Sequence, residues 1–453
     1  MTTRNAAPVF WRTLDEWADD PSFRERLYNE FPSAVEAITD EATRRTFLKL
    51  MGASMALAGL TACTRQPEEK IVAYVRQPEE TIPGKPLFYA TTMALGAMAT
   101  GLLVETHEGR PTKIEGNPLH PASLGACDVF AQAAILGLYD PDRARTLSNL
   151  GEIRPWAAFL GMIRAAVTAQ LPLQGAGIRI LTETVNSPTL AAQIRDLLQR
   201  FPSAKWHQWD PLGFSNTRAG ARLAFADNVA PVYRFERADV IVSLDADFLG
   251  SGPGGLAYAR AFASRRRPED AERMNRLYAI ETMPTSTGSR ADYRFPAKPS
   301  VIPDIARVLA AALGAGTADT VTLPEGWPQR ITAIANDLRA HRGASLVVAG
   351  ESQPPAVHAL VHLMNQTLGN AGATVVYLPA GDLPAGDEVE SLRELTADME
   401  AGHVDLLIIL GGNPAYTAPV DVPFVKALAK VQTRVHLSLY ADETSEWRQW
   451  QIP

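Results

Sequence analysis

The chain has 453 residues and a mass of 49.1 kDa, and 46% of its residues are hydrophobic while 21% are charged. This composition excludes a disordered protein and supplies enough apolar material for two or more globular domains. The formal net charge of -7 and the pI near 5.7 exclude a nucleic-acid partner, because phosphate binding at physiological salt requires a dense excess of Lys and Arg.

A twin-arginine export signal is predicted near the amino terminus. Two adjacent arginines directly precede the apolar run 50–62, which is rich in small residues. The run is shorter than the roughly 20 residues that a helix needs to cross a bilayer, so a transmembrane span is the weaker interpretation. The signal predicts that the folded protein is exported to the periplasmic face of the cytoplasmic membrane. Its residues are Arg44, Arg45, Phe47, Leu48 and Lys49.

Residues 60–63 have the pattern of a lipoprotein cleavage site, which favours Cys63 as an acylated membrane anchor rather than a ligand. An unprocessed leader with a chance cysteine is the alternative. The long segment 1–43 predicts short amphipathic helices, either a docking or chaperone-recognition element or an incidental extension. The whole of 1–63 is therefore interpreted as a leader.

A small mixed β domain is predicted for 64–154. The apolar runs 101–106 and 111–115 flank the turn 108–110, which is the pattern of a β-hairpin.

Beyond Pro155, predicted strands alternate with helices, one of them at about 187–201. This alternation predicts two doubly wound parallel-sheet units, which makes the fold class α/β. A Gly- and Pro-containing stretch at 314–327 predicts that the units are 155–315 and 316–453, the second of them truncated. The expected strands are 178–181, a segment near Trp206, 240–244, 277–280, 345–349, 375–378, 406–410 and 435–439.

The segment 250–255 fits the G-x-G-x-x-G spacing between a predicted strand and a predicted helix, where backbone amides cradle a pyrophosphate. Glu281, at the end of the next strand, would then hold a ribose. Pro253 removes one amide donor, and the preceding strand is not expected to be the first of its unit. A tight glycine turn without a ligand is therefore favoured over nicotinamide binding.

His358 and His362 stand four residues apart in a predicted helix, where they would share one face as metal ligands. Ala359 occupies the position of the general-base glutamate of a zinc protease, so capped or surface histidines are favoured. The loops 350–355 and 411–414 follow strands directly, where open α/β sheets bind ligands. Their Gly, Asn and Pro are also typical of plain turns.

Several short motifs lie along the body. They are residues 114–121 (Ile-Glu-Gly-Asn-Pro-Leu-His-Pro), 125–127 (Gly-Ala-Cys), 138–143 (Leu-Tyr-Asp-Pro-Asp-Arg), 281–296 with Thr285, Thr287 and Asp292, 411–414 (Gly-Gly-Asn-Pro) and 438–444. Together they resemble molybdopterin oxidoreductases, in which the fourth motif resembles a loop near a pterin phosphate. With the long segment before the arginines, nearly the whole chain resembles the amino-terminal, molybdopterin-oxidoreductase-like part of a subunit of alternative complex III, a quinol-oxidising respiratory complex.

The chain departs from catalytic members of that family. They would supply several cysteines between 87 and 106, ahead of the one matched by Cys127, but the segment 88–98 has none. Cys127 cannot hold a four-iron cluster alone and is expected to be a buried, unreactive thiol. No residue is identified as a catalytic group, a cofactor ligand or a molybdenum ligand. The resemblance therefore implies a retained fold and no cofactor in this chain.

The predicted function is a non-catalytic scaffold subunit of a membrane-bound quinol-oxidising electron-transfer complex. The resemblance implies iron–sulfur, multihaem cytochrome and integral membrane partners, which would hold the clusters and the haem. Three alternatives stay open: a catalytic molybdopterin oxidoreductase of polysulfide-reductase type, a nicotinamide-binding dehydrogenase, and a free periplasmic binding lipoprotein with two α/β units around a cleft.

Overall fold

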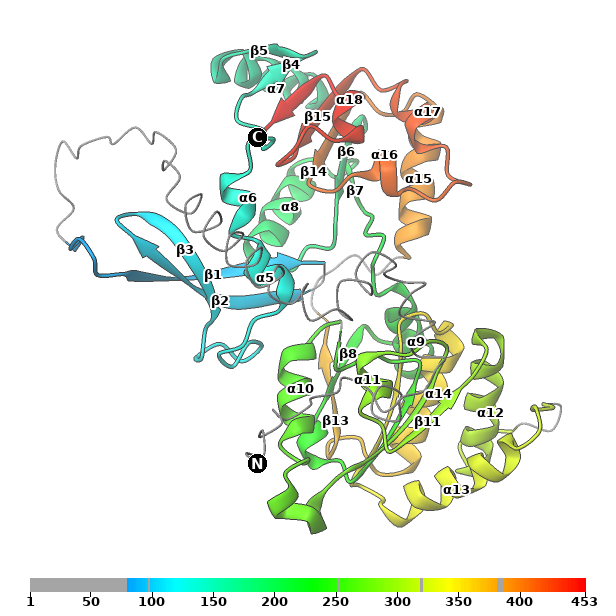
Figure 1. Ribbon diagram of the computed structural model, residues 1–453. Coiled ribbons are helices and arrows are strands. Elements are labelled where there is room, and N and C mark those ends of the chain that lie inside the picture. Colours follow the sequence, from blue (N-terminus) through cyan, green and yellow to red (C-terminus); the bar gives the residue numbers. More distant parts are fainter. Residues whose placement is uncertain (1–79, 97, 251, 318–320, 381–386) are drawn as a thin grey trace, which may run out of the picture. The chain divides into compact units, whose positions relative to one another are not determined.

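The computed structural model describes residues 80–453 except 97, 251, 318–320 and 381–386 (Figure 1). The predicted export signal from Arg44 to Lys49 and the candidate anchor Cys63 lie outside these residues. The described part is a mixed α/β structure with a three-stranded antiparallel sheet and two larger sheets built on parallel strands. No helix in it is both long enough and apolar enough to cross a bilayer.

The small β domain is the antiparallel sheet β1-β2-β3. Glu108 and Gly109 both have positive φ angles, 51° and 83°, as a two-residue hairpin turn requires. The predicted hairpin is therefore confirmed. The strands are β1 (Leu87–Leu95), β2 (Met98–His107) and β3 (Arg110–Gly116), and the short helices α5 (Val129–Ala133) and α6 (Leu136–Tyr139) follow them.

Two glycines allow the loop after β3 to fold back onto this sheet. A Cβ on Gly101 would lie 2.2 Å from the His120 ring, and one on Gly116 would lie 2.0 Å from the backbone oxygen of Ala126. The Asn117 amide donates to the Gly101 oxygen at 2.9 Å. The motif 114–121 is thus explained by backbone packing within the domain.

The first large sheet has seven strands in the order β5-β4-β16-β15-β14-β6-β7, of which β16, β15, β14, β6 and β7 run parallel. Helices α7 and α8 pack on one face, and α15 and α17 pack on the other. The strands are β4 (Ser148–Asn149), β5 (Glu152–Ile153), β6 (Ile178–Thr182), β7 (Lys205–Gln208), β14 (Leu406–Leu410), β15 (Thr433–Leu437) and β16 (Trp450–Ile452). The helices are α7 (Trp156–Gln170), α8 (Pro188–Arg200), α15 (Glu388–Glu400), α16 (Pro414–Thr417), α17 (Phe424–Leu428) and α18 (Glu443–Glu446).

The second large sheet has four parallel strands in the order β11-β10-β9-β12. Val242 of its central strand faces the core under α12, α13 and α14, while the adjacent Ile241 faces the core under α10. Burial of both faces explains why its strands read as continuous apolar runs. The strands are β9 (Val240–Leu244), β10 (Arg276–Glu281), β11 (Tyr293–Pro296) and β12 (Ser345–Ala349).

Five longer helices and one four-residue helix belong to this part of the chain, together with a two-stranded antiparallel sheet of β8 (Val229–Tyr233) and β13 (Val375–Pro379). The helices are α9 (Ser215–Phe225), α10 (Gly255–Ala263), α11 (Ser286–Ser289), α12 (Ile302–Ala312), α13 (Trp327–Ala340) and α14 (Pro355–Thr367).

Every expected strand exists, but the strands pair differently from the predicted order. The chain leaves the seven-stranded sheet after β7, forms the four-stranded sheet, and returns at β14. Sheet membership therefore crosses the expected boundary between 315 and 316. One expectation was wrong: the strand at 375–378 pairs antiparallel. As expected, β9 is not the first strand of the predicted unit 155–315, although it is the first strand of its own sheet. Hydrophobic periodicity identifies a strand but does not identify its neighbour.

Candidate functional site

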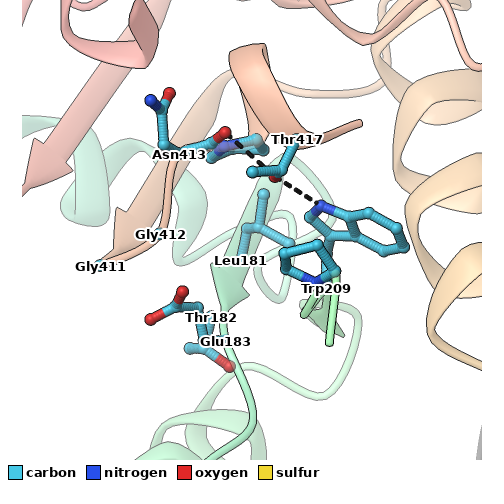
Figure 2. A pocket seen from close by; sticks show the side chains of 10 residues that line it. Leu181, Thr182, Glu183, Trp209, Gly411, Gly412, Asn413 and Thr417 are labelled. Atoms are coloured by element: carbon cyan, nitrogen blue, oxygen red, sulfur yellow. Dashed lines mark hydrogen bonds between the residues drawn. The ribbon is translucent and has the colours of Figure 1, made fainter. Parts of the chain in front are cut away.

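The seven-stranded sheet has a topological switch point between β6 and β14, because the chain proceeds from β6 to β7 on one side and from β14 to β15 on the other. Ligands of open α/β sheets bind at the carboxyl ends of such strands. A cavity of about 220 Å³, including its open mouth, lies there (Figure 2). The enclosed space within it is about 10 Å³, room for about one water molecule and far less than the roughly 300–1,000 Å³ of most ligand pockets. Its lining is Leu181, Thr182, Glu183, Trp209, Pro211, Gly411, Gly412, Asn413, Pro414 and Thr417.

The predicted loop 411–414 lines this cavity. The Trp209 indole Nε1 donates to Thr417 Oγ1 at 2.9 Å, and that hydroxyl donates to the backbone oxygen of Asn413 at 3.0 Å (Figure 2). Gly412 has a φ of 69°, and a Cβ there would lie 3.1 Å from Cγ of Glu183. The loop thus holds a left-handed backbone against an acidic side chain.

The polar groups of this loop bond mainly to the other predicted segment, 438–444. Asn413 Oδ1 accepts from Thr444 N at 3.1 Å and from Thr444 Oγ1 at 2.8 Å, and its Nδ2 donates to Glu443 at 2.6 Å. The buried His436 ring lies between the Gly412 oxygen, at 3.1 Å, and Ser445 Oγ, at 3.0 Å. The structure therefore brings the two segments together, but their polar groups form hydrogen bonds with one another.

The carboxyl edge of the seven-stranded sheet is acidic. Partial burial of its carboxyl raises the pKa of Glu183, and nearby Asp210 raises it further. Burial also raises the pKa of Glu388, although Arg218 opposes that shift through an ion pair. Asn186, in the loop after β6, donates to the oxygens of Gly96 and Met98 at 3.2 and 2.8 Å, so the turn between β1 and β2 also contacts this edge.

The carboxyl edge of the four-stranded sheet is occupied by Asp245, which directly follows β9. Its Oδ1 accepts from Thr282 N at 2.9 Å, and its Oδ2 accepts from Thr282 Oγ1 at 3.3 Å, Ser352 Oγ at 3.1 Å and Gln353 Nε2 at 3.2 Å. The predicted loop 350–355 thus donates two of these bonds.

The loop that resembles a pterin-phosphate loop is engaged by the protein's own side chains. Thr287 donates its amide and its hydroxyl to Asp247 Oδ1, both at 2.9 Å. Glu281 is 3% exposed, pairs with Arg294 and accepts from Thr285 Oγ1 at 2.6 Å, so its carboxylate is not available to a ribose. Asp292 likewise forms an ion pair, with Arg266, at 2.6 Å.

Residues 252–254 of the glycine segment lead directly into α10. Gly252 and Gly254 have φ angles of 96° and 79°, and a Cβ on Gly254 would lie 2.8 Å from the Tyr258 ring. At Gly250 the corresponding Cβ would lie 2.1 Å from an oxygen of Asp247. A carboxylate therefore lies against the loop where a pyrophosphate would need to approach.

The two histidines of α14 are buried, so the surface alternative of the expected capped or surface histidines was wrong. His358 and His362 are each 3% exposed, and burial lowers the pKa of each to about 4. His362 Nδ1 lies 3.1 Å from the Tyr377 hydroxyl, and a Cβ on Gly220 of α9 would lie 2.3 Å from the His358 Cβ. Across the described part of the chain, no three metal-binding side chains come together.

Cys127 is half-buried rather than buried, and Gln132 Nε2 donates to its sulfur at 2.8 Å. The described residues of the cysteine-free segment 88–98 belong mostly to β1, and Met98 begins β2.

Sequence reasoning missed Asp245 and the ion pair of Arg218 with Glu388, although it did single out the loop 350–355 that contains Glu351. Asp245 directly follows a strand, which is a usable signal. Arg218 and Glu388 meet through a contact between distant elements, which local patterns do not reveal.

Comparison with known proteins gives a distant relative and a shared fold. No protein-family model matches the chain. The menaquinone reductase, molybdopterin-binding-like subunit of Nitratidesulfovibrio vulgaris is 21% identical over 445 residues, covering 89% of this chain and 64% of the relative. The chain thus spans less than two thirds of that relative. Acetylene hydratase from Pelobacter acetylenicus matches with a TM-score of 0.56 and 12% identity, covering 79% of this chain and 61% of the hydratase.

These comparisons confirm the predicted fold class. The chain has a mixed α/β fold with parallel sheets, similar to the fold of acetylene hydratase. The finer resemblance to a component of alternative complex III stays a prediction.

Proposed function

We propose that the chain is a non-catalytic, molybdopterin-oxidoreductase-like scaffold subunit of a membrane-bound, quinol-oxidising electron-transfer complex of the alternative complex III type. After twin-arginine export, it works at the periplasmic face of the cytoplasmic membrane. The complex, or a lipid on Cys63, attaches it to the membrane. Iron–sulfur clusters and haem belong to its partners.

The observation that carries this proposal is the charge at the two carboxyl edges. In this fold class, a dinucleotide diphosphate binds at such edges through amide donors and cations. Here Glu183 and Asp210 line one edge, while Asp245 and Asp247 line the other. Carboxylates at these positions repel phosphate oxygens, so the residues present do not fit a pterin dinucleotide.

The segment 88–98 gives a second argument. It lies at the place where the resemblance leads us to expect cluster cysteines, yet its residues 88–95 form a strand that pairs antiparallel with β2. A four-iron cluster needs several thiolates, and Cys127 provides one. The usual electron route to a pterin is therefore missing from this chain.

Exposed apolar surface supports a role in assembly. β1 carries no charged residue, pairs only with β2 among the described residues, and exposes Phe88 and Tyr89 by 56% and 55%. The charge-free segment 129–139 exposes Val129 by 71% and Leu136 by 70%. Isolated proteins protect long apolar edge strands, whereas subunits cover them with partners.

The relative's name supports a quinone-linked complex, because that protein is a molybdopterin-binding-like subunit of a menaquinone reductase. We infer that an iron–sulfur subunit contacts the β1 surface, and that cytochrome and membrane subunits complete the assembly.

Purification of the tagged chain in mild detergent tests this assignment. The wild-type protein should retain haem-containing and iron-containing subunits. Tyr89→Lys should lose the iron–sulfur subunit without changing the melting temperature, because Tyr89 is 55% exposed. Leu212→Lys, at an 81% exposed site outside β1 and 129–139, is the matched control and should retain all partners. Wild-type protein that purifies alone and without haem would contradict the proposal.

A further inference from the structure

Asp245 has an unusual backbone and an unusually well-satisfied carboxylate. Its φ of 57° lies in the left-handed region, which costs free energy for any residue with a side chain. Its two carboxylate oxygens accept four hydrogen bonds, from Thr282 N, Thr282 Oγ1, Ser352 Oγ and Gln353 Nε2. The strained backbone is therefore held by a complete set of donors.

These donors converge at the switch point of the four-stranded sheet. β9 and β12 are neighbours there, and β10 lies on the other side of β9. The Asp245 amide donates to Ile280 O at 2.7 Å, and the Gly350 amide donates to Leu244 O at 3.0 Å. A Cβ on Gly350 would lie 1.9 Å from the backbone oxygen of Asp245, so glycine is required for this close approach.

The donor set is of the kind that an α/β fold offers to a ligand anion: one backbone amide, two hydroxyls and one carboxamide. All four donors are neutral. A carboxylate that is covalently part of the chain needs no cation to hold it, because no binding entropy is lost.

A second carboxylate occupies another anion position nearby. Glu351 accepts from the amides of Asn216, at 2.7 Å, and Thr217, at 3.3 Å, which belong to the first turn of α9. Helix amino termini attract anions because their amides and macrodipole are unsatisfied. Burial raises the pKa of Glu351, while these hydrogen bonds oppose that shift.

We propose that Asp245 is a built-in occupant of the anion site at this switch point, with Glu351 filling the adjacent helix terminus. The two carboxylates take the places that ligand anions would take, and they close this half of the fold to phosphate-containing cofactors. The proposal deepens the proposed non-catalytic role. Removing the Asp245 carboxylate should open a cradle for a small carboxylate such as acetate.

Chemical rescue by acetate tests this assignment on the full chain. Asp245→Gly removes the carboxylate and tolerates the positive φ, so its lower melting temperature reports lost hydrogen bonds rather than added strain. Acetate at about ten times its dissociation constant should raise that melting temperature by about 2 °C or more, relative to chloride at equal ionic strength. The wild-type protein should show no such gain.

Two matched variants make the result specific. Asp245→Asn keeps the cradle filled, so acetate should not stabilise it. Asp142→Gly removes an exposed loop aspartate and should also be insensitive to acetate. An equal response of the wild-type and Asp245→Gly proteins, or no response in either, would overturn the proposal.

If Asp245→Gly does not fold, a double-mutant cycle replaces it. Ser352→Ala should lower the melting temperature of the wild-type protein more than that of Asp245→Asn, because Ser352 Oγ donates to the Asp245 carboxylate. Additive effects would reject the proposed anion site. Acetate rescue in a protein that carries molybdenum would instead uphold the anion site and reject the non-catalytic role.

Discussion

The two carboxyl edges of this molecule have the same architecture but different electrostatics. At the four-stranded sheet, Asp245, Asp247 and Glu351 all accept hydrogen bonds from the protein itself. At the seven-stranded sheet, Glu183 lies beside a small cavity and Asp210 raises its pKa. At the first edge, hydrogen-bonded carboxylates already fill the positions where a ligand anion would bind. At the second edge, the carboxylates would repel a ligand anion.

This difference shows that one fold can lose a ligand site in two ways. A site filled by internal carboxylates contributes to stability, because each charged group has donors. A site that only accumulates like charges is destabilising at neutral pH. Substitutions at the two edges, and at the ion pair that joins α9 to α15, separate these cases.

The largest effect is expected from Arg218→Met. Arg218 of α9 pairs with Glu388 of α15, whose side chain is 4% exposed, so the substitution leaves a buried carboxylate without its cation. Breaking such a pair costs about 3–5 kcal/mol of unfolding free energy. Urea unfolding measures this loss. The double variant Arg218→Met with Glu388→Leu should recover most of it, and a double variant as unstable as the single one would contradict the assignment.

Acid should destabilise both large-sheet parts of the chain, because each part contains two buried histidines whose pKa is lowered by burial. His358 and His362 pack against α9, while His207 lies on β7, and burial lowers the pKa of each from 6.5 to about 4. Between these pH values the unfolded chain binds protons that the folded chain does not, so stability falls as the pH falls. Each histidine should contribute a loss of about 2 kcal/mol between about pH 7.5 and about pH 5.

His362→Gln keeps a hydrogen-bonding group opposite Tyr377 and removes the titration. Its unfolding free energy should therefore depend on pH less steeply than that of the wild-type protein. His403→Gln, at a 67% exposed side chain, is the control and should leave the slope unchanged. Equal slopes for His362→Gln and the wild type would show that buried histidines do not cause the acid sensitivity.

The smallest effects compare the two edges directly. Asp247→Asn removes a charged acceptor from two bonds of Thr287 and should cost about 1–2 kcal/mol at neutral pH. Glu183→Gln should change stability by about 0.5 kcal/mol or less, in the stabilising direction, because it relieves repulsion from Asp210 at a partly solvated site. Chemical denaturation measures the unfolding free energy of both variants. Equal losses of unfolding free energy would contradict the proposed difference between the two edges.

The sequence predicts the elements of this fold well and their partners poorly. Apolar runs such as 240–244 and 406–410 identify buried strands, and the turn at Glu108 and Gly109 identifies the hairpin. The chain returns to the seven-stranded sheet because β14 pairs with β6. These two strands lie more than 200 residues apart in sequence, so local patterns do not predict that they are neighbours.

The candidate site shows the same limit. The loops 350–355 and 411–414 do lie at carboxyl edges, as strand order suggests. Sequence alone does not reveal that Ser352 and Gln353 donate to Asp245, because the contact joins positions more than 100 residues apart. Burial of His358 and His362 likewise depends on how closely Gly220 lets α9 approach α14.

Quantifying molybdenum and pterin in the full-length protein, purified from its native membrane with its partners, tests the central claim most directly. The account predicts iron and haem in the accompanying subunits and no stoichiometric molybdenum or pterin with this chain. One molybdenum and its pterin per chain would contradict it, because a dinucleotide would then bind at edges that we interpret as closed by carboxylates.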